Sequence, residues 1–267
     1  MQGGFPRRLG ATLAGLVLVA AGPAPGPLRI VGGGAGCIQG AVELPGSGPG
    51  WETIRQSRST FWGAPVTVAG IETLARRARA AGLPMLYIND FSLPRGGPLA
   101  GLHASHQTGL DADVWLDVSP KPDLTAAERD LVEPRSLVLP GGREVDPAAW
   151  DPGHATLIRL ATELPGVDRV LVNPAIKAEL CREAGPADEA WLHRVRPWWG
   201  HSAHMHVHFL CPPGQAECRD LPPIPAGAGC DASLAWWFAQ LERPAPPAVP
   251  AHPPPLPAAC NAILGED

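Results

Sequence analysis

The most regular hydrophobic pattern in the chain is an alternation with a period of two over residues 111–118. Asp111, Asp113, Trp115 and Asp117 fall on one side, and aliphatic side chains fall on the other. A strand with this pattern packs its apolar face on a core and presents its polar face to a cleft. The pattern therefore predicts a strand whose polar face is rich in carboxylates.

A second segment, residues 201–209, alternates in the same way. His204, His206 and His208 share one face, and the intervening Met, Val and Phe side chains share the other. The sequence thus predicts two strands that bury aliphatic residues on one side and present imidazoles or carboxylates on the other.

The remaining periodic segments predict helices and short buried strands. Apolar residues at helical spacing, with Gly82 as a C-cap, indicate a first helix. These elements together predict an α+β fold, in which helices and long loops flank a small antiparallel sheet that carries the two alternating segments. The expected helices are 66–81, 155–164 and 176–184, and the further strands are 85–88, 167–172 and 205–211.

The two ends of the chain differ from its middle. Residues 1–26 have two arginines followed by a short apolar run, which is typical of a secretory signal peptide, with an uncleaved anchor as the alternative. Residues 27–50 carry no periodicity and are expected to be an extended arm, and residues 51–218 are expected to form the main domain. Residues 219–267 form a loop-rich extension with a proline-rich stretch over 243–257.

Composition narrows the classes of function. The 267 residues are 45% hydrophobic and carry a net charge of −5, with no basic patch that would favour nucleic acid. Beyond the signal segment, no stretch is long and apolar enough to span a bilayer. Six cysteines without C-x-x-C spacing suit an exported protein with three disulfides, but the sequence alone allows fifteen pairings.

Metal binding is the chemistry that these residue types favour. Six of the nine histidines lie in the segments 103–106 and 201–208, close to carboxylates. Two imidazoles and one carboxylate make a three-ligand zinc site that leaves a fourth position for water, as in catalytic zinc sites. His106, Asp113 and His206 are the expected ligands, and the metal would activate water for hydrolysis of a peptide bond.

The motifs H-A-S-H-Q-T-G-L-D-A-D at 103–113 and H-S-A-H-M-H-V at 201–207 resemble those of the penicillin-insensitive murein endopeptidases. These belong to a metallopeptidase group with lysostaphin-type and D-alanyl-D-alanine peptidases and the hedgehog domain. The resemblance extends over Val172–Lys177, Val195–Trp198 and the cysteines, from about Gly50 to Cys260. It implies that 51–218 is a catalytic domain, with the disulfides Cys37–Cys260, Cys181–Cys230 and Cys211–Cys218.

The resemblance and the strand pattern assign roles to neighbouring side chains. His204 is expected to act as general acid/base or oxyanion stabiliser. His201 is a further proton-transfer or substrate group, with a structural role as the alternative. The resemblance implies that His103 contacts the metal or lines the site; the alternatives are a hydrogen bond to a metal ligand or a contact with the substrate. Asp111 is expected to orient a ligand imidazole rather than bind the metal, and His208 to be exposed.

The resemblance also implies a substrate and a location: the D-alanyl–meso-diaminopimelyl cross-links of peptidoglycan, in the periplasm. One zinc ion is expected, because the turn at which some relatives carry further ligands has Gly141 and Glu144 here. Two alternatives remain, a D-Ala-D-Ala carboxypeptidase or dipeptidase of the same group and a non-catalytic zinc-dependent module that binds the cell wall. The oligomeric state is not predicted.

Overall fold

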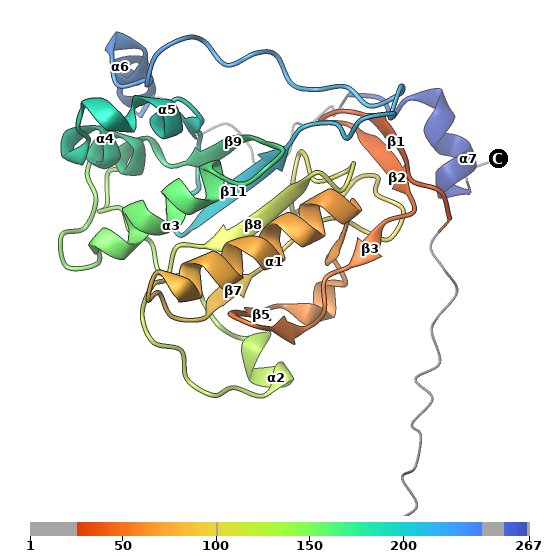
Figure 1. Ribbon diagram of the computed structural model, residues 1–267, viewed down its shortest axis with the longest axis horizontal. Helices are drawn as coiled ribbons and strands as arrows, with labels where there is room; N and C mark the ends of the chain where they lie inside the picture. Colours follow the sequence, from red (N-terminus) through yellow and green to blue (C-terminus); the bar gives the residue numbers. More distant parts are fainter. Residues whose placement is uncertain (1–25, 100, 242–253, 266–267) are drawn as a thin grey trace, which may run out of the picture.

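The computed structural model describes residues 26–99, 101–241 and 254–265 (Figure 1). Almost all of the expected signal peptide, and most of the proline-rich stretch, lie outside these residues. Within the described residues, no helix has the length and apolar character needed to span a membrane.

The centre of the molecule is a mixed sheet of seven strands in the order β10-β9-β11-β8-β7-β5-β4. The expected small antiparallel sheet is therefore wrong in size and in type. β5 pairs parallel with β7, and β10 pairs parallel with β9. β5 and β10 are three residues long, which is too short for an alternation of hydrophobic and polar residues to be recognised in the sequence. The strands are β4 (Ser47–Gly48), β5 (Trp51–Thr53), β7 (Leu86–Ile88), β8 (Asp111–Trp115), β9 (Val167–Val172), β10 (Val195–Pro197) and β11 (His204–Phe209).

The segment 27–50, expected to be an extended arm, contains regular structure. β1 (Arg29–Gly32) and β2 (Gly36–Gln39) form an antiparallel hairpin. β3 (Val42–Glu43) pairs with β6 (Trp62–Gly63) in a second small sheet. Because these strands have two to four residues each, glycine-rich turns dominate the sequence and hide the alternation.

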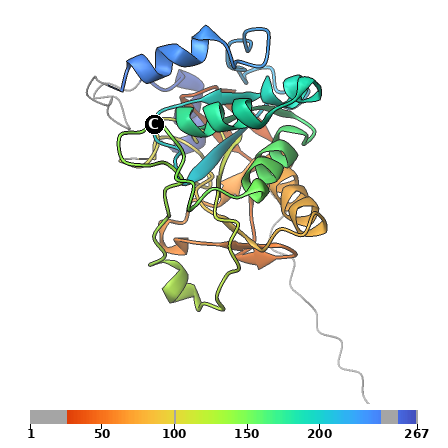
Figure 2. The same cartoon turned by 90° about the vertical axis from the view of Figure 1, so that its left-hand side faces the viewer.

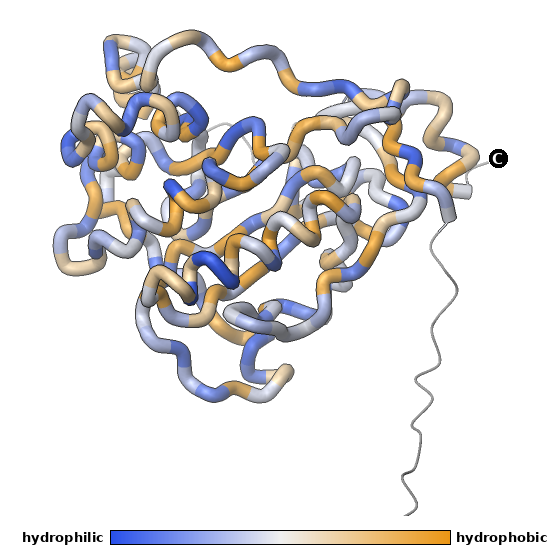
Figure 3. Tube along the Cα trace, in the orientation of Figure 1, coloured by the Kyte–Doolittle hydropathy of each residue, from blue (hydrophilic) through white to orange (hydrophobic). Residues whose placement is uncertain are grey.

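Two long helices cover one face of the central sheet (Figures 1 and 2). α1 (Pro65–Ala80) begins at a proline, and Gly82 follows its end with φ 84°, a left-handed conformation that suits glycine. α3 (Pro152–Thr162) begins after Asp151, whose carboxylate accepts from the Gly153 N–H. The helices and the strands behind them both carry hydrophobic residues (Figure 3). Their buried apolar side chains belong to one cluster, so the main core lies between the two layers.

Shorter helices lie around this core. α4 (Pro174–Glu183) begins after Asn173, whose side chain accepts from the Ala175 N–H, and so starts two residues earlier than its apolar spacing predicts. The others are α2 (Ala126–Arg129), α5 (Glu189–Leu192), α6 (Ala232–Ala239), α7 (Asn261–Leu264) and the 3-10 turns η1 (Gln56–Arg58), η2 (Pro186–Asp188) and η3 (Ala258–Cys260).

Three disulfides tie the loops to this framework. They join the pairs that the family resemblance implies, Cys37–Cys260, Cys181–Cys230 and Cys211–Cys218. The first connects β2 to η3, and the second connects α4 to the residue that precedes α6 by two positions. The C-terminal segment is thus fixed to the body of the protein at two places.

The opposite face of the sheet holds the polar side of the two alternating segments. β8 and β11 pair antiparallel, so that His206 lies opposite Asp113 and His208 lies opposite Asp111. This register brings imidazoles and carboxylates together across neighbouring strands. The polar face is buried rather than open, because every residue of β8 is buried.

Candidate metal centre

His106, Asp113 and His206 converge from three segments of the chain. Asp113 and His206 come from the paired strands β8 and β11, and His106 comes from the loop before β8. His106 has φ 65°, a left-handed conformation that costs a non-glycine residue on the order of 1–3 kcal/mol. The Asp111 carboxylate accepts the His106 backbone N–H at 2.9 Å, which compensates part of this strain.

The hydrogen bonds of the two histidines define where their lone pairs point. His106 Nδ1 lies 2.8 Å from the Phe91 carbonyl oxygen, which can only accept, so Nδ1 carries the proton. His206 Nε2 donates in the same way to Asp111 Oδ1 at 3.0 Å. In the neutral form of both rings, the unprotonated nitrogens are His106 Nε2 and His206 Nδ1, which face each other at 3.0 Å.

Asp113 Oδ1 completes the group. It lies 3.4 Å from His106 Nε2 and 3.4 Å from His206 Nδ1, and it is buried without a hydrogen-bond partner. Zinc bonds of about 2.0–2.1 Å in tetrahedral geometry place ligand atoms about 3.3 Å apart. Three buried acceptor atoms at this spacing repel one another unless a cation lies between them, so the set fits a metal ion.

The electrostatics of the site also favour a cation. Burial opposes ionisation of Asp111 and Asp113, but the neighbouring imidazoles lower the pKa of each carboxyl well below its usual range. Burial would lower the pKa of His206, yet the carboxylates, chiefly Asp111, raise that pKa to about 10. The two carboxylates thus stay ionised and retain a positive charge beside them, either as a proton or as a metal ion.

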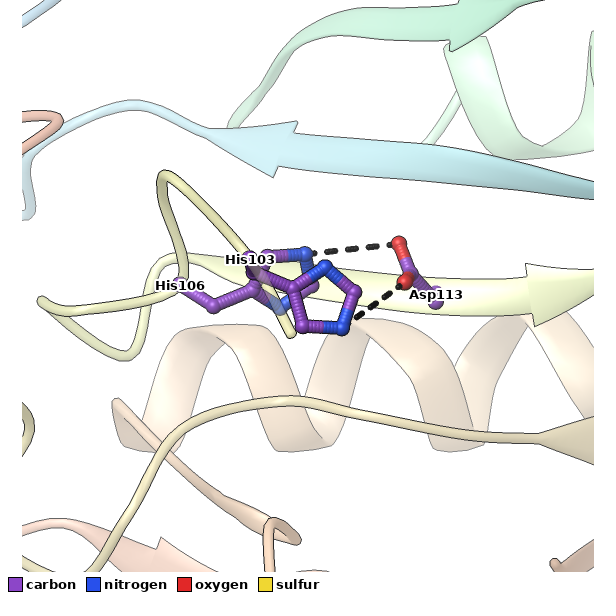
Figure 4. A group of neighbouring side chains, drawn as sticks. All are labelled: His103, His106 and Asp113. Carbon is purple, nitrogen blue, oxygen red and sulfur yellow. Dashed lines mark ion pairs between the residues drawn. The ribbon is translucent and has the colours of Figure 1, made fainter. Parts of the chain in front are cut away.

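The second oxygen of Asp113 faces two further imidazoles. Its Oδ2 lies 3.6 Å from His204 Nε2 and 3.8 Å from His103 Nε2. Figure 4 shows His103 and His106 both pointing toward this carboxylate. His103 Nε2 also lies 2.8 Å from Asp90 Oδ2, so the ring nitrogen nearest the centre already has a partner.

Asp90 is the residue of this site that sequence reasoning missed. Its buried carboxylate binds Arg58 Nη1 at 2.7 Å and the Thr60 hydroxyl at 2.6 Å, as well as His103. Burial opposes the ionisation of Asp90, but these hydrogen bonds and charges lower its pKa overall. The available signal was the Asn89-Asp90 pair that follows the buried strand 85–88.

His208 is buried, with 6% exposure, although the sequence pattern favoured an exposed position. Its Nδ1 donates to Asp111 Oδ1 at 2.6 Å. Asp111 therefore accepts from the His206 ring, the His208 ring and the His106 backbone. One carboxylate behind the converging atoms thus fixes the orientation of both histidines that reach the centre.

His201 lies at the rim of the group. It also has a positive φ, 51°, and its Nδ1 donates to the Trp199 carbonyl at 2.7 Å. Its ring centroid lies 4.9 Å from that of His204 and 5.9 Å from that of His206. Burial, together with the neighbouring imidazoles, lowers the pKa of His201 to about 3, so this side chain is neutral at physiological pH.

Two groups of side chains in the described part of the chain lie close enough to share an ion: His103, His106 and Asp113, and Asp111, His206 and His208. The facing lone pairs of His106 and His206 connect the two groups. Neither group includes Glu144 of the turn at 140–144.

The chain is similar to known proteins over nearly all of its described length. The sequence profile of the family described as penicillin-insensitive murein endopeptidase matches residues 30–265. A protein of that name from Haemophilus influenzae is 42% identical over 233 residues, which cover 86% of this chain and 79% of that protein. One from Klebsiella pneumoniae is 43% identical over 86% of this chain and 84% of its own length.

Proposed function

Because the chain belongs to the penicillin-insensitive murein endopeptidase family, we propose that it hydrolyses peptide cross-links of peptidoglycan with the aid of a zinc ion. The bond cleaved is the one between D-alanine and meso-diaminopimelate. The location is the periplasm, which suits three disulfides.

The observation that carries this proposal is the convergence of His106 Nε2, His206 Nδ1 and Asp113 Oδ1 within 3.0–3.4 Å of one another. Imidazole nitrogen and carboxylate oxygen are both good zinc ligands, and three protein ligands leave one coordination position open. His103 is a further candidate, but its shortest contact is to Asp90.

When bound, a zinc ion supplies Lewis acidity, which polarises a peptide carbonyl and lowers the pKa of water to about 7. The protein residues orient the reactants and move protons. Burial lowers the pKa of His204, and the charge of Asp113 only partly opposes this shift, so the imidazole is neutral and can accept a proton from the attacking water. It then donates that proton to the leaving amine. Its side chain is 30% exposed, so substrate can reach it.

Cleavage of defined muropeptide dimers tests this function. Purified protein loaded with zinc is expected to convert cross-linked dimers into monomers, whereas prior removal of metal with a chelator lowers the rate at least hundredfold and added zinc restores it. Product masses separate hydrolysis of the cross-link from loss of a terminal D-alanine. Intact dimers after incubation with the zinc-loaded protein would show that the proposed function is wrong.

Replacement of His204 with alanine separates proton transfer from metal binding. Because His204 reaches Asp113 Oδ2 only at 3.6 Å and is not one of the three converging groups, the variant is expected to retain its metal. Loss of the general acid/base should lower kcat by about 10²–10⁴-fold with little change in KM. Metal content and dimer cleavage are measured on the same sample, and a fully active His204→Ala protein would remove His204 from the mechanism.

A further inference from the structure

A group of four tryptophans, two exposed and two half-buried, lies beside the metal centre. Trp198 and Trp199 come from the turn between β10 and β11, and Trp236 and Trp237 come from α6. The Trp237 ring centroid lies 5.8 Å from Trp198, 5.0 Å from Trp199 and 5.1 Å from Trp236. We refer to these four side chains as the tryptophan surface.

The packing of the protein does not account for this surface. Trp198 is 50% exposed and Trp236 is 55% exposed. In α6, an almost wholly apolar helix, Leu234 is the buried residue. A helix with apolar residues on most of its circumference normally buries them in a core, and contiguous exposed apolar groups mark sites of interaction.

The fold holds this surface in a defined position. The Cys181–Cys230 disulfide joins α4 to the start of α6, and the buried Lys177 Nζ donates to the Ala228 carbonyl at 2.7 Å. On the other side, the Asn173 amide donates to the Gly200 carbonyl at 2.8 Å. Both halves of the surface are therefore fixed to α4 and the residue before it, and the rings do not need to be ordered when a ligand binds.

The backbone of Trp199 connects the tryptophan surface to the residues around the metal centre. The Trp199 carbonyl accepts from the ring of His201, and His201 packs against His204 and His206. A long ligand with one part at the metal centre therefore has its neighbouring part beside the tryptophans.

We propose that the tryptophan surface binds aminosugar rings of the glycan strand to which the cross-linked peptide is attached. Sugar rings present faces of C–H bonds, which pack against the electron-rich faces of aromatic rings. Residues 232–241 and 197–200 contain no charged side chain, which suits a ligand made of neutral rings and disfavours a strongly charged partner. The proposal rests on the proposed murein endopeptidase function, because that substrate brings sugar and peptide to the protein together.

Trp236→Ala tests this inference, since Trp236 is the most exposed of the group on α6 and lies outside the metal centre. Cleavage of intact murein is expected to fall at least fivefold, whereas cleavage of sugar-free cross-linked peptide dimers should change by less than twofold. Leu131→Ala is the matched control, because Leu131 is also an exposed apolar side chain, at 78% exposure, and is expected to leave both rates unchanged.

A binding measurement separates this inference from the function on which it rests. Titration with an oligomer of N-acetylglucosamine is expected to change the tryptophan fluorescence of the wild-type protein, with at least fivefold weaker binding in Trp236→Ala. Equal losses on both substrates, or no loss on either together with no oligomer binding, would overturn the proposal; in the second case the surface serves another partner, such as a protein. A wild-type protein that binds the oligomer but cleaves no dimer would instead contradict the proposed function alone.

Discussion

Asp113→Asn is expected to lose the metal ion and to lower the rate of dimer cleavage at least ten-thousandfold, which is more than 5 kcal/mol of transition-state stabilisation. Asparagine keeps the shape of the side chain but removes the negative charge that pairs with the cation. Its amide would also place a donor or a neutral oxygen where an ionised carboxylate oxygen now lies 3.4 Å from both His106 Nε2 and His206 Nδ1. The fold should persist, because both side chains fill the same volume.

The matched control is Asp117→Asn. Asp117 lies four residues along the chain, and its carboxylate bonds to Ser119 and Lys121 rather than to the histidines. This variant is expected to keep its zinc content and its activity. Metal analysis and muropeptide cleavage on both variants provide the measurement. Full zinc content in Asp113→Asn, with normal activity, would mean that this carboxylate is not a ligand.

Removal of the Cys37–Cys260 disulfide is expected to lower the free energy of unfolding by about 5 kcal/mol. The bond joins residues 223 positions apart, so it restricts most of the unfolded chain. Removal of the bond affects the folded state less than the unfolded state, because both cysteines already lie in a small buried cluster with Val31 and Ile263. Urea unfolding of the double variant Cys37→Ala/Cys260→Ala, compared with wild type, measures the effect.

The short Cys211–Cys218 loop provides the comparison. Its cysteines are 7 positions apart, and the same chain-entropy relation gives about 2 kcal/mol for its removal. The first double variant is therefore expected to be destabilised about twice as much as Cys211→Ala/Cys218→Ala. Equal shifts in the urea midpoint would indicate that loop length does not determine the contribution of these bonds.

The composition of the site follows from the alternation of the sequence. A period of two places His206 and His208 on one face of β11, and it places Asp111 and Asp113 on one face of β8. Only the register of β8 against β11 decides that His206 lies opposite Asp113, and register depends on contacts along the whole strand pair. The residue types could therefore be predicted from the sequence, but the distances between them could not.

Other features leave weaker signals in the sequence. Asp90 acts through partners at positions 58, 60 and 103, and no local pattern reports such distant contacts. β5 and β10, the strands that make the sheet large and mixed, are three residues long. Burial of His208 likewise depends on Asp111 in the neighbouring strand. In each case the information lies in tertiary pairing rather than in periodicity.

We propose that His106, Asp113 and His206 together hold one zinc ion. Anomalous scattering at the zinc absorption edge, from crystals of the zinc-loaded protein, tests it most directly. One strong peak is expected about 2.0–2.2 Å from His106 Nε2, His206 Nδ1 and Asp113 Oδ1. A map without a peak among these three atoms, or with the ion held only by other side chains, would contradict it.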